Sequence, residues 1–131
     1  MRDINSDSSN APALSPEKDM TLDQYHHWAG MTAAYPTPAE TLDLPIYTSL
    51  KLAGEAGEVA EKVGKIMRDK EGKLDQSDTV ELCKELGDVL WYVSRMADDL
   101  GVPLSVVAAM NLEKLLSRKA RGKISGEGDD R

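Results

Sequence analysis

The pattern of apolar residues in this chain favours helices over strands. Between Tyr47 and Gly122 no useful length alternates apolar and polar residues, the period of two that a half-buried strand requires. The sequence contains no Phe and only 5% aromatic residues, so its core must consist of Leu, Val, Ile, Met and Ala. Strands usually recruit β-branched and aromatic residues. The fold is therefore predicted to be all-α.

Proline, glycine and polar capping residues divide the chain into four predicted helices. The 131 residues suffice for one compact domain, which we place at residues 17–122. A disordered tail rich in Ser, Asn, Asp and Pro is expected at residues 1–16, and a flexible tail at 123–131. The predicted helices are 22–35 with Thr21 as N-cap, about 44–69, Ser77 or Asp78 to Leu100, and Pro103 to Gly122, with 68–78 as a loop.

Charge, cysteine content and hydropathy exclude several classes of protein. A net charge of -7 opposes general affinity for nucleic-acid backbones, so no nucleic-acid partner is predicted. The single cysteine, Cys83, cannot form an internal disulfide. The chain has neither a run of about 18 apolar residues nor an apolar signal core at its N-terminus. We predict a cytoplasmic protein without a membrane partner.

Two acidic pairs border the apolar faces of the second and third predicted helices. Glu55 and Glu58 form the first pair, and Glu85 and Asp88 the second. A spacing of three residues brings two carboxylates side by side on a helix, so that both can reach one hard cation. Four carboxylates converging at a core margin repel one another unless a cation such as Mg²⁺ neutralises them. The apolar face of the second predicted helix consists of Leu52, Val59, Val63 and Ile66. That of the third consists of Leu82, Val89, Val93, Met96 and Leu100.

Glycines beside the acidic pairs strengthen this interpretation. Gly54, Gly57 and Gly87 each cost about 1 kcal/mol of helix propensity, and would allow a backbone or a ligand to approach closely. A single Glu-x-x-Glu is usually only a solvated helix face, and Glu58 with Lys62 forms a common helix-stabilising pair. Two acidic pairs that both border an apolar face and both adjoin glycine favour a metal site.

The fourth predicted helix carries the complementary charge. Asn111, Lys114 and Arg118 lie within about 60° of one another around the helix. An amide, an ammonium and a planar guanidinium are suited to phosphate oxygens. The alternative is that the two cations only complement the helix dipole. The neighbouring apolar face is Leu104, Val107, Ala108, Leu112 and Leu115.

The segments GEAGEVAEK, KELGDVLWYV and NLEKLLSRK together resemble the MazG-like family of all-α nucleoside triphosphate pyrophosphohydrolases. The resemblance covers roughly residues 44–122. The family signature is Glu-x-x-Glu on one helix and Glu-x-x-Asp on the next, followed by Asn, Lys and Arg. The matching residues are Glu55, Glu58, Glu85, Asp88, Asn111, Lys114 and Arg118.

The resemblance implies an activity, a cofactor and an assembly. The expected reaction is hydrolysis of a (deoxy)nucleoside triphosphate between its α and β phosphates, giving the monophosphate and pyrophosphate. Mg²⁺ is the expected cofactor, with Mn²⁺ as a substitute. Family members are homodimers or homotetramers in which neighbouring subunits complete a four-helix bundle around each site. Such an assembly suits a chain whose single subunit leaves an apolar face exposed.

The resemblance also implies roles for individual residues. The two acidic pairs are expected to bind the metal, with Glu55 or Glu58 also acting as the catalytic group that positions or deprotonates the attacking water. Lys114 and Arg118 are expected to stabilise charge on the departing pyrophosphate. From its position one helical turn after Asp88, Tyr92 is a further candidate to donate its hydroxyl to a phosphate or sugar, although a tyrosine at a core margin is equally common.

The aromatic first helix offers a candidate for base recognition. Trp28 is predicted to stack on the base, although a Trp on an amphipathic helix is more often a core residue. The neighbouring His26 and His27 point to different helix faces, which makes them a poor metal pair.

Two other functions remain open, and a third is disfavoured. Phosphoribosyl-ATP pyrophosphohydrolase belongs to the same superfamily. A di-iron or di-manganese centre would use Glu-x-x-His motifs, which this sequence lacks. A non-catalytic helical interaction protein would bind a partner through the acidic edges. The sequence does not predict the preferred base or sugar. It also does not distinguish removal of damaged nucleotides from control of nucleotide pools or of alarmone levels.

Overall fold

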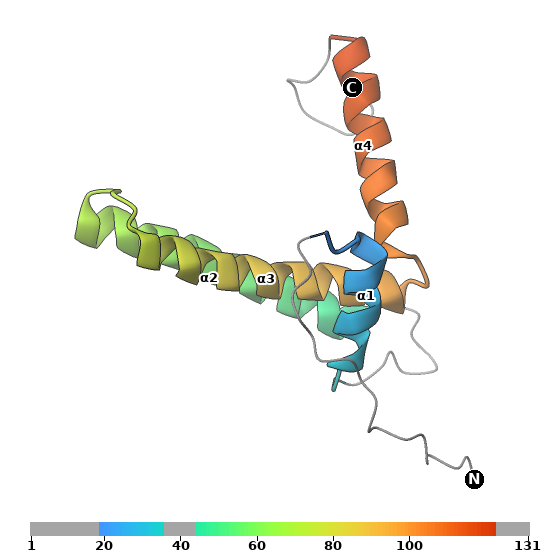
Figure 1. The fold of residues 1–131 in the computed structure, drawn as a ribbon, viewed down its shortest axis with the longest axis horizontal. Helices are drawn as coiled ribbons and strands as arrows, with labels where there is room; N and C mark the ends of the chain where they lie inside the picture. The colour runs from blue at the N-terminus through green and yellow to red at the C-terminus, as the bar shows by residue number, and fades with distance from the viewer. Residues whose placement is uncertain (1–18, 36–43, 123–131) are drawn as a thin grey trace.

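The computed structural model describes residues 19–35 and 44–122, which form four helices and no strand. These are α1 (Leu22–Met31), α2 (Ile46–Lys70), α3 (Gln76–Asp99) and α4 (Leu104–Ala120) (Figure 1). The prediction of an all-α fold with four main helices is confirmed. The tails predicted at 1–16 and 123–131 lie outside the described residues, and the domain boundaries stay a prediction.

Capping interactions define where α1 and α3 begin, and one of the two caps differs from the predicted residue. Thr21 caps α1 as expected, since its hydroxyl accepts a hydrogen bond from the backbone N–H of Gln24. The cap of α3 is Asp75, upstream of the predicted Ser77 or Asp78. Asp75 and Asp78 each accept a hydrogen bond from the other's backbone N–H, so one capping box satisfies two otherwise unpaired donors.

Two predicted segments are shorter than expected because tertiary contacts and turn geometry end them early. The first helix stops at Met31 rather than Tyr35. The residues that follow instead contact α3, where Trp91 donates a hydrogen bond of 2.8 Å to the Thr32 hydroxyl. The loop between α2 and α3 shrinks to 71–75, because Glu71 and Gly72 adopt left-handed conformations that reverse the chain at once.

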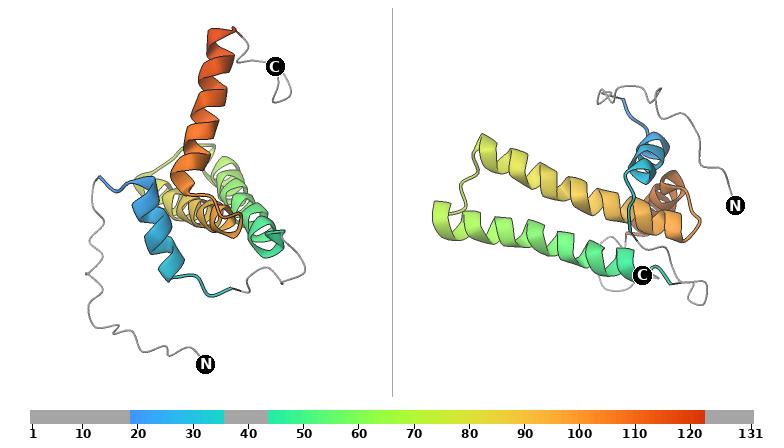
Figure 2. Two further views of the ribbon diagram at one scale, coloured as in Figure 1. Left: turned by 90° about the vertical axis from the view of Figure 1, so that its right-hand side faces the viewer. Right: turned by 90° about the horizontal axis from the view of Figure 1, so that it is seen from below.

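Helices α2 and α3 form a long antiparallel hairpin (Figure 2). The apolar faces predicted for the two helices pack along it, with Leu52, Val59 and Val89 partly buried. Val63 and Leu100, predicted on the same faces, are exposed. A single hairpin therefore buries only part of the apolar surface of these two helices.

Helix α1 packs across the open end of the hairpin against α3 (Figure 2). Arg95 of α3 is buried there and donates hydrogen bonds to the His26 carbonyl and the Ser94 hydroxyl. A Cβ at Gly30 would lie 2.8 Å from Nη1 of Arg95, so a larger residue at this position would require the Arg95 guanidinium to shift.

Helix α4 turns away from the hairpin, with a bend of 102° between α3 and α4 (Figure 1). Asp23 of α1 anchors its start by accepting hydrogen bonds from the backbone N–H of Ser105 at 3.1 Å and from its hydroxyl at 2.7 Å. These bonds lower the pKa of Asp23. Leu104 is buried, but Val107 and Leu112 of the predicted apolar face are exposed. Most of that face has no partner within the described chain.

Among the described helices, none is by itself long and apolar enough to cross a membrane. Only α3 and α4 taken together, as a sharply bent pair, meet the criteria of length and composition.

Candidate metal centre

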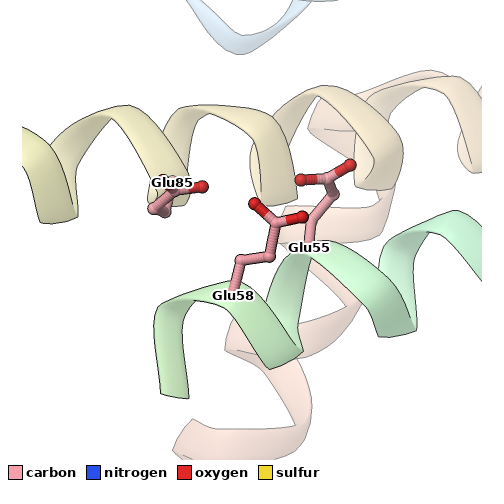
Figure 3. Close-up of side chains that lie close together, drawn as sticks. All are labelled: Glu55, Glu58 and Glu85. Carbon is pink, nitrogen blue, oxygen red and sulfur yellow. The ribbon is translucent and has the colours of Figure 1, made fainter. Parts of the chain in front are cut away.

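Three glutamates from two helices converge inside the hairpin (Figure 3). Glu55 and Glu58 rise from α2 toward α3, and Glu85 comes from α3. One carboxylate oxygen from each lies within 4.8 Å of the others. The side chains of Glu55 and Glu85 are only 12% and 13% exposed, whereas Glu58 is open to solvent. We call Glu55, Glu58 and Glu85 the acidic cluster.

The charges of the acidic cluster repel one another. The neighbouring carboxylates of Glu55 and Glu85 raise the pKa of Glu58 above its ordinary value. A bound cation would relieve this repulsion. The donors are all carboxylate oxygens, which Mg²⁺ and Mn²⁺ prefer. The residues present therefore fit a hard divalent cation.

Two lysines of α2 flank the acidic cluster. Lys51, one turn before Glu55, places its Nζ 3.4 Å from a carboxylate oxygen of Glu55. Lys62, one turn after Glu58, does not form the expected pair along its own helix. It reaches across to α3, where its Nζ lies 3.0 Å from Glu85 and 3.0 Å from Glu81. Spacing alone indicated the helical pair and could not reveal this contact across the hairpin.

Asp88, the fourth predicted ligand, lies one turn beyond Glu85 on α3 and is exposed. The three-carboxylate group found among the described residues does not include it. The charge of Asp88 contributes to the raised pKa of Tyr25 in α1, which is raised chiefly by burial. Asp88 as a metal ligand stays a prediction.

The glycines beside the acidic pairs face open space. A Cβ added at Gly54, Gly57 or Gly87 would meet no atom of another described segment within 4 Å. The expected close approach of a second backbone is therefore wrong within a single described chain. The space remains available to a ligand or to a second chain.

An aromatic group adjoins one end of the acidic cluster. Tyr92 packs edge-to-face on Trp91 at 4.8 Å between ring centroids, and Lys51 lies 5.7 Å from the centroid of the Tyr92 ring. Because Lys51 also pairs with Glu55, Tyr92 is linked to the cluster. Tyr35 extends the group by stacking on Tyr47 at 5.3 Å and meeting Trp91 edge-on.

The sequence reasoning selected Tyr92 for this region but missed the rest of the aromatic group. Its members come from three separate segments, so no sequence spacing joins them. Trp28, predicted to stack on the base, packs edge-to-face on its neighbour His27 in α1 at 5.5 Å. Its contact with substrate stays a prediction.

The predicted phosphate-binding residues are carried on α4. Asn111 is exposed, Lys114 is half-buried and Arg118 is buried. In the described chain α4 contacts α1 and α3 but not α2 (Figure 1). A single chain therefore does not pack these residues against the helix that carries Glu55 and Glu58.

A comparison with known families identifies the chain. The family model of the MazG nucleotide pyrophosphohydrolase domain matches residues 46–122, more than half of the sequence. The chain belongs to the MazG family. The match begins at the start of α2 and includes α3, α4 and the acidic cluster of this MazG domain. It supports nucleotide pyrophosphohydrolase activity and thus a hydrolase.

One relative of this MazG protein is the gene 37 protein of Mycobacterium phage L5. The two are 47% identical over 114 residues, which cover 86% of this chain and 100% of the phage protein. The name of the relative states no activity. No solved structure matches the chain significantly. MazG proteins generally use a divalent metal, and the acidic cluster supplies suitable donors for one.

Proposed function

We propose that this MazG protein catalyses Mg²⁺-dependent hydrolysis of (deoxy)nucleoside triphosphates between the α and β phosphates. The products are the nucleoside monophosphate and pyrophosphate, and the role is removal or control of nucleotides in the cellular pool. One observation carries the proposal: three glutamates from α2 and α3 meet within 4.8 Å, inside the region that matches the MazG domain. Mn²⁺ is expected to substitute for Mg²⁺.

Four carboxylates would hold the metal. The acidic cluster supplies three, and Asp88, one turn from Glu85, would supply the fourth. When bound, the cation contributes positive charge at the phosphates and makes a bound water more acidic. The partial burial of Glu55 and Glu85 favours cation binding there, since a less hydrated carboxylate gains more from a cation.

Side chains of the protein perform the proton transfer and bind the phosphates, the sugar and the base. Glu55 or Glu58 accepts the proton of the attacking water. Lys114 and Arg118 donate to the pyrophosphate as its negative charge grows, and Asn111 orients a phosphate through its amide. Tyr92 contacts the sugar or a phosphate, consistent with its link to Glu55 through Lys51. Trp28 stacks on the base.

A homodimer or homotetramer would complete this site. Large apolar side chains are exposed along α4, and α4 does not contact α2 in the described chain. A second chain packed on this helix would bury the apolar surface and surround the acidic cluster with a four-helix bundle. The exposed residues are Val106, Val107, Met110, Leu112, Leu115 and Leu116.

Product analysis tests the proposed reaction. The purified protein is incubated with each NTP and dNTP and with phosphoribosyl-ATP, in Mg²⁺ or in EDTA, and the products are separated by ion-exchange chromatography. We expect monophosphate and pyrophosphate in Mg²⁺ and none in EDTA. Diphosphate with orthophosphate would contradict cleavage of the α–β bond. Turnover of phosphoribosyl-ATP alone would identify the protein as a phosphoribosyl-ATP pyrophosphohydrolase. No turnover of any substrate would favour a binding role.

A further inference from the structure

Lys62 joins the acidic cluster to a carboxylate outside it. Its Nζ lies 3.0 Å from Oε1 of Glu85 and 3.0 Å from Oε2 of Glu81. Glu81 and Glu85 are one turn apart on α3, and only Glu85 belongs to the acidic cluster. The Lys62 ammonium thus contacts Glu85, a candidate metal ligand, and Glu81, which lies outside the acidic cluster.

The Lys62 ammonium and a divalent cation would compete for the carboxylate of Glu85. The side chain of Lys62 is 30% exposed and that of Glu85 only 13%, so solvent screens this ion pair less than a fully exposed one. The lysine ammonium is charged at neutral pH because its ordinary pKa lies far above 7. Mg²⁺ binds oxygen ligands at about 2.0–2.1 Å, and would repel an ammonium held on the same carboxylate.

Glu81 provides a second position for the displaced ammonium. It already accepts a hydrogen bond from Lys62 at 3.0 Å and pairs with Lys84 at 2.6 Å. Lys62 can therefore leave Glu85 while keeping a charged partner. The change requires only rotation of a long, flexible side chain and no movement of either helix.

We propose that Lys62 is an internal counter-ion of the metal centre, bridging Glu85 and Glu81 in the cation-free protein and pairing with Glu81 alone when a divalent cation binds. The inference rests on the proposed function only in taking Glu85 as a metal ligand. Lys62 is then a positioning residue: it sets the affinity for the cation and stabilises the cation-free hairpin.

Cation titration in the absence of nucleotide tests the role of Lys62. Metal-free wild type and Lys62→Met are titrated with Mn²⁺ in a calorimeter, and their thermal unfolding is followed without cation. The variant is expected to bind Mn²⁺ about fivefold more tightly, because no ion pair must be displaced, and to unfold at a lower temperature without cation. Lys65→Met is the matched control, because Lys65 pairs with Glu61 at 2.7 Å on α2, outside the acidic cluster. Its affinity for Mn²⁺ is expected to stay at the wild-type value.

A double-mutant cycle isolates the transfer to Glu81. Glu81→Gln removes the second position, so it is expected to weaken Mn²⁺ binding in the wild type but not in the Lys62→Met background. Equal effects of Glu81→Gln in both backgrounds would overturn the transfer. Lys62→Gln replaces Lys62→Met in the cycle if the latter does not fold.

The outcomes separate this inference from the proposed function. If the wild type binds Mn²⁺ and Lys62→Met binds it equally or more weakly, the counter-ion role is wrong and the metal centre stands. If the folded wild type binds no Mn²⁺ and no Mg²⁺, the metal centre is wrong and the role of Lys62 fails with it.

Discussion

Thr48 donates a hydrogen bond of 2.8 Å to Oδ2 of Asp99, joining the first turn of α2 to the last residue of α3. Thr48 is 0% exposed, and the other oxygen of Asp99 accepts a hydrogen bond of 3.2 Å from the Tyr35 hydroxyl. These bonds hold the open end of the hairpin. They thereby help to set the register in which the glutamates of α2 face those of α3.

Removing the Thr48 hydroxyl should destabilise the fold. Thr48→Val keeps the shape of the side chain but leaves the Asp99 carboxylate without one of the two donors that the described residues supply. We expect the free energy of unfolding to fall by about 1–3 kcal/mol, measured by urea denaturation and circular dichroism. Ser49→Ala is the control, because the Ser49 hydroxyl donates its hydrogen bond to the Ile46 carbonyl of its own helix. An equal loss in both variants would contradict a special role for the Thr48 contact.

Neutralising a carboxylate of the acidic cluster should abolish turnover. In Glu85→Gln the amide keeps the size of the side chain but binds Mg²⁺ poorly, so kcat with Mg²⁺ is expected to fall by about 100-fold or more. The control is Glu61→Gln, which removes one charge from α2 at an exposed position paired with Lys65. Full Mg²⁺-dependent turnover by Glu85→Gln would show that the metal assignment is wrong.

The stability of the cation-free protein should depend on the charge of Glu58. The pKa of Glu58 is raised above its ordinary value of 4.5 by Glu55 and Glu85, so folding disfavours its ionised form. Its contribution to stability is therefore fully present below 4.5 and is lost as the pH rises through the raised value in the folded state. We expect Glu58→Gln to raise the melting temperature in EDTA at pH 7, with the gain vanishing near about pH 4.

Glu61→Gln provides a control of opposite sign for the Glu58 experiment. The pKa of Glu61 is lowered by its hydrogen bond to Lys65, so its charge favours folding above the ordinary pKa of 4.5. This variant is expected to lose a little stability at pH 7. A gain of the same size in both variants would indicate relief of net charge rather than repulsion within the acidic cluster.

A charge on the apolar face of α4 should disrupt the proposed assembly. Leu116 is 64% exposed in the single chain, and Leu116→Glu would place a carboxylate in the subunit interface. Sedimentation velocity is expected to show a dimer or tetramer for the wild type and a smaller species for the variant. Glu113→Gln, a change at an exposed polar position of the same helix, should keep the wild-type mass. A monomeric wild type would contradict the proposed assembly.

The sequence predicted the helices and the acidic pairs because these features are local. Period, capping residues and helix-ending glycines act within about four residues of the chain, so the positions of α2, α3 and α4 followed from them closely. The spacing of Glu55 and Glu58 likewise places both on one helix face without knowledge of any other segment. One local prediction was wrong: α3 is capped by Asp75 rather than by Ser77 or Asp78, and the capping box of Asp75 with Asp78 satisfies two backbone donors.

Only the tertiary structure decided which of these residues meet. The register of α2 against α3 depends on partners such as Thr48 and Asp99, 51 residues apart, and it brings Glu85 into the cluster while leaving Asp88 outside the three converging carboxylates. The same packing turns Lys62 from its own helix toward α3. Sequence alone determined the chemistry available on each helix, because helix geometry is a short-range property. Packing determined which charges face one another, because that depends on the distances between helices.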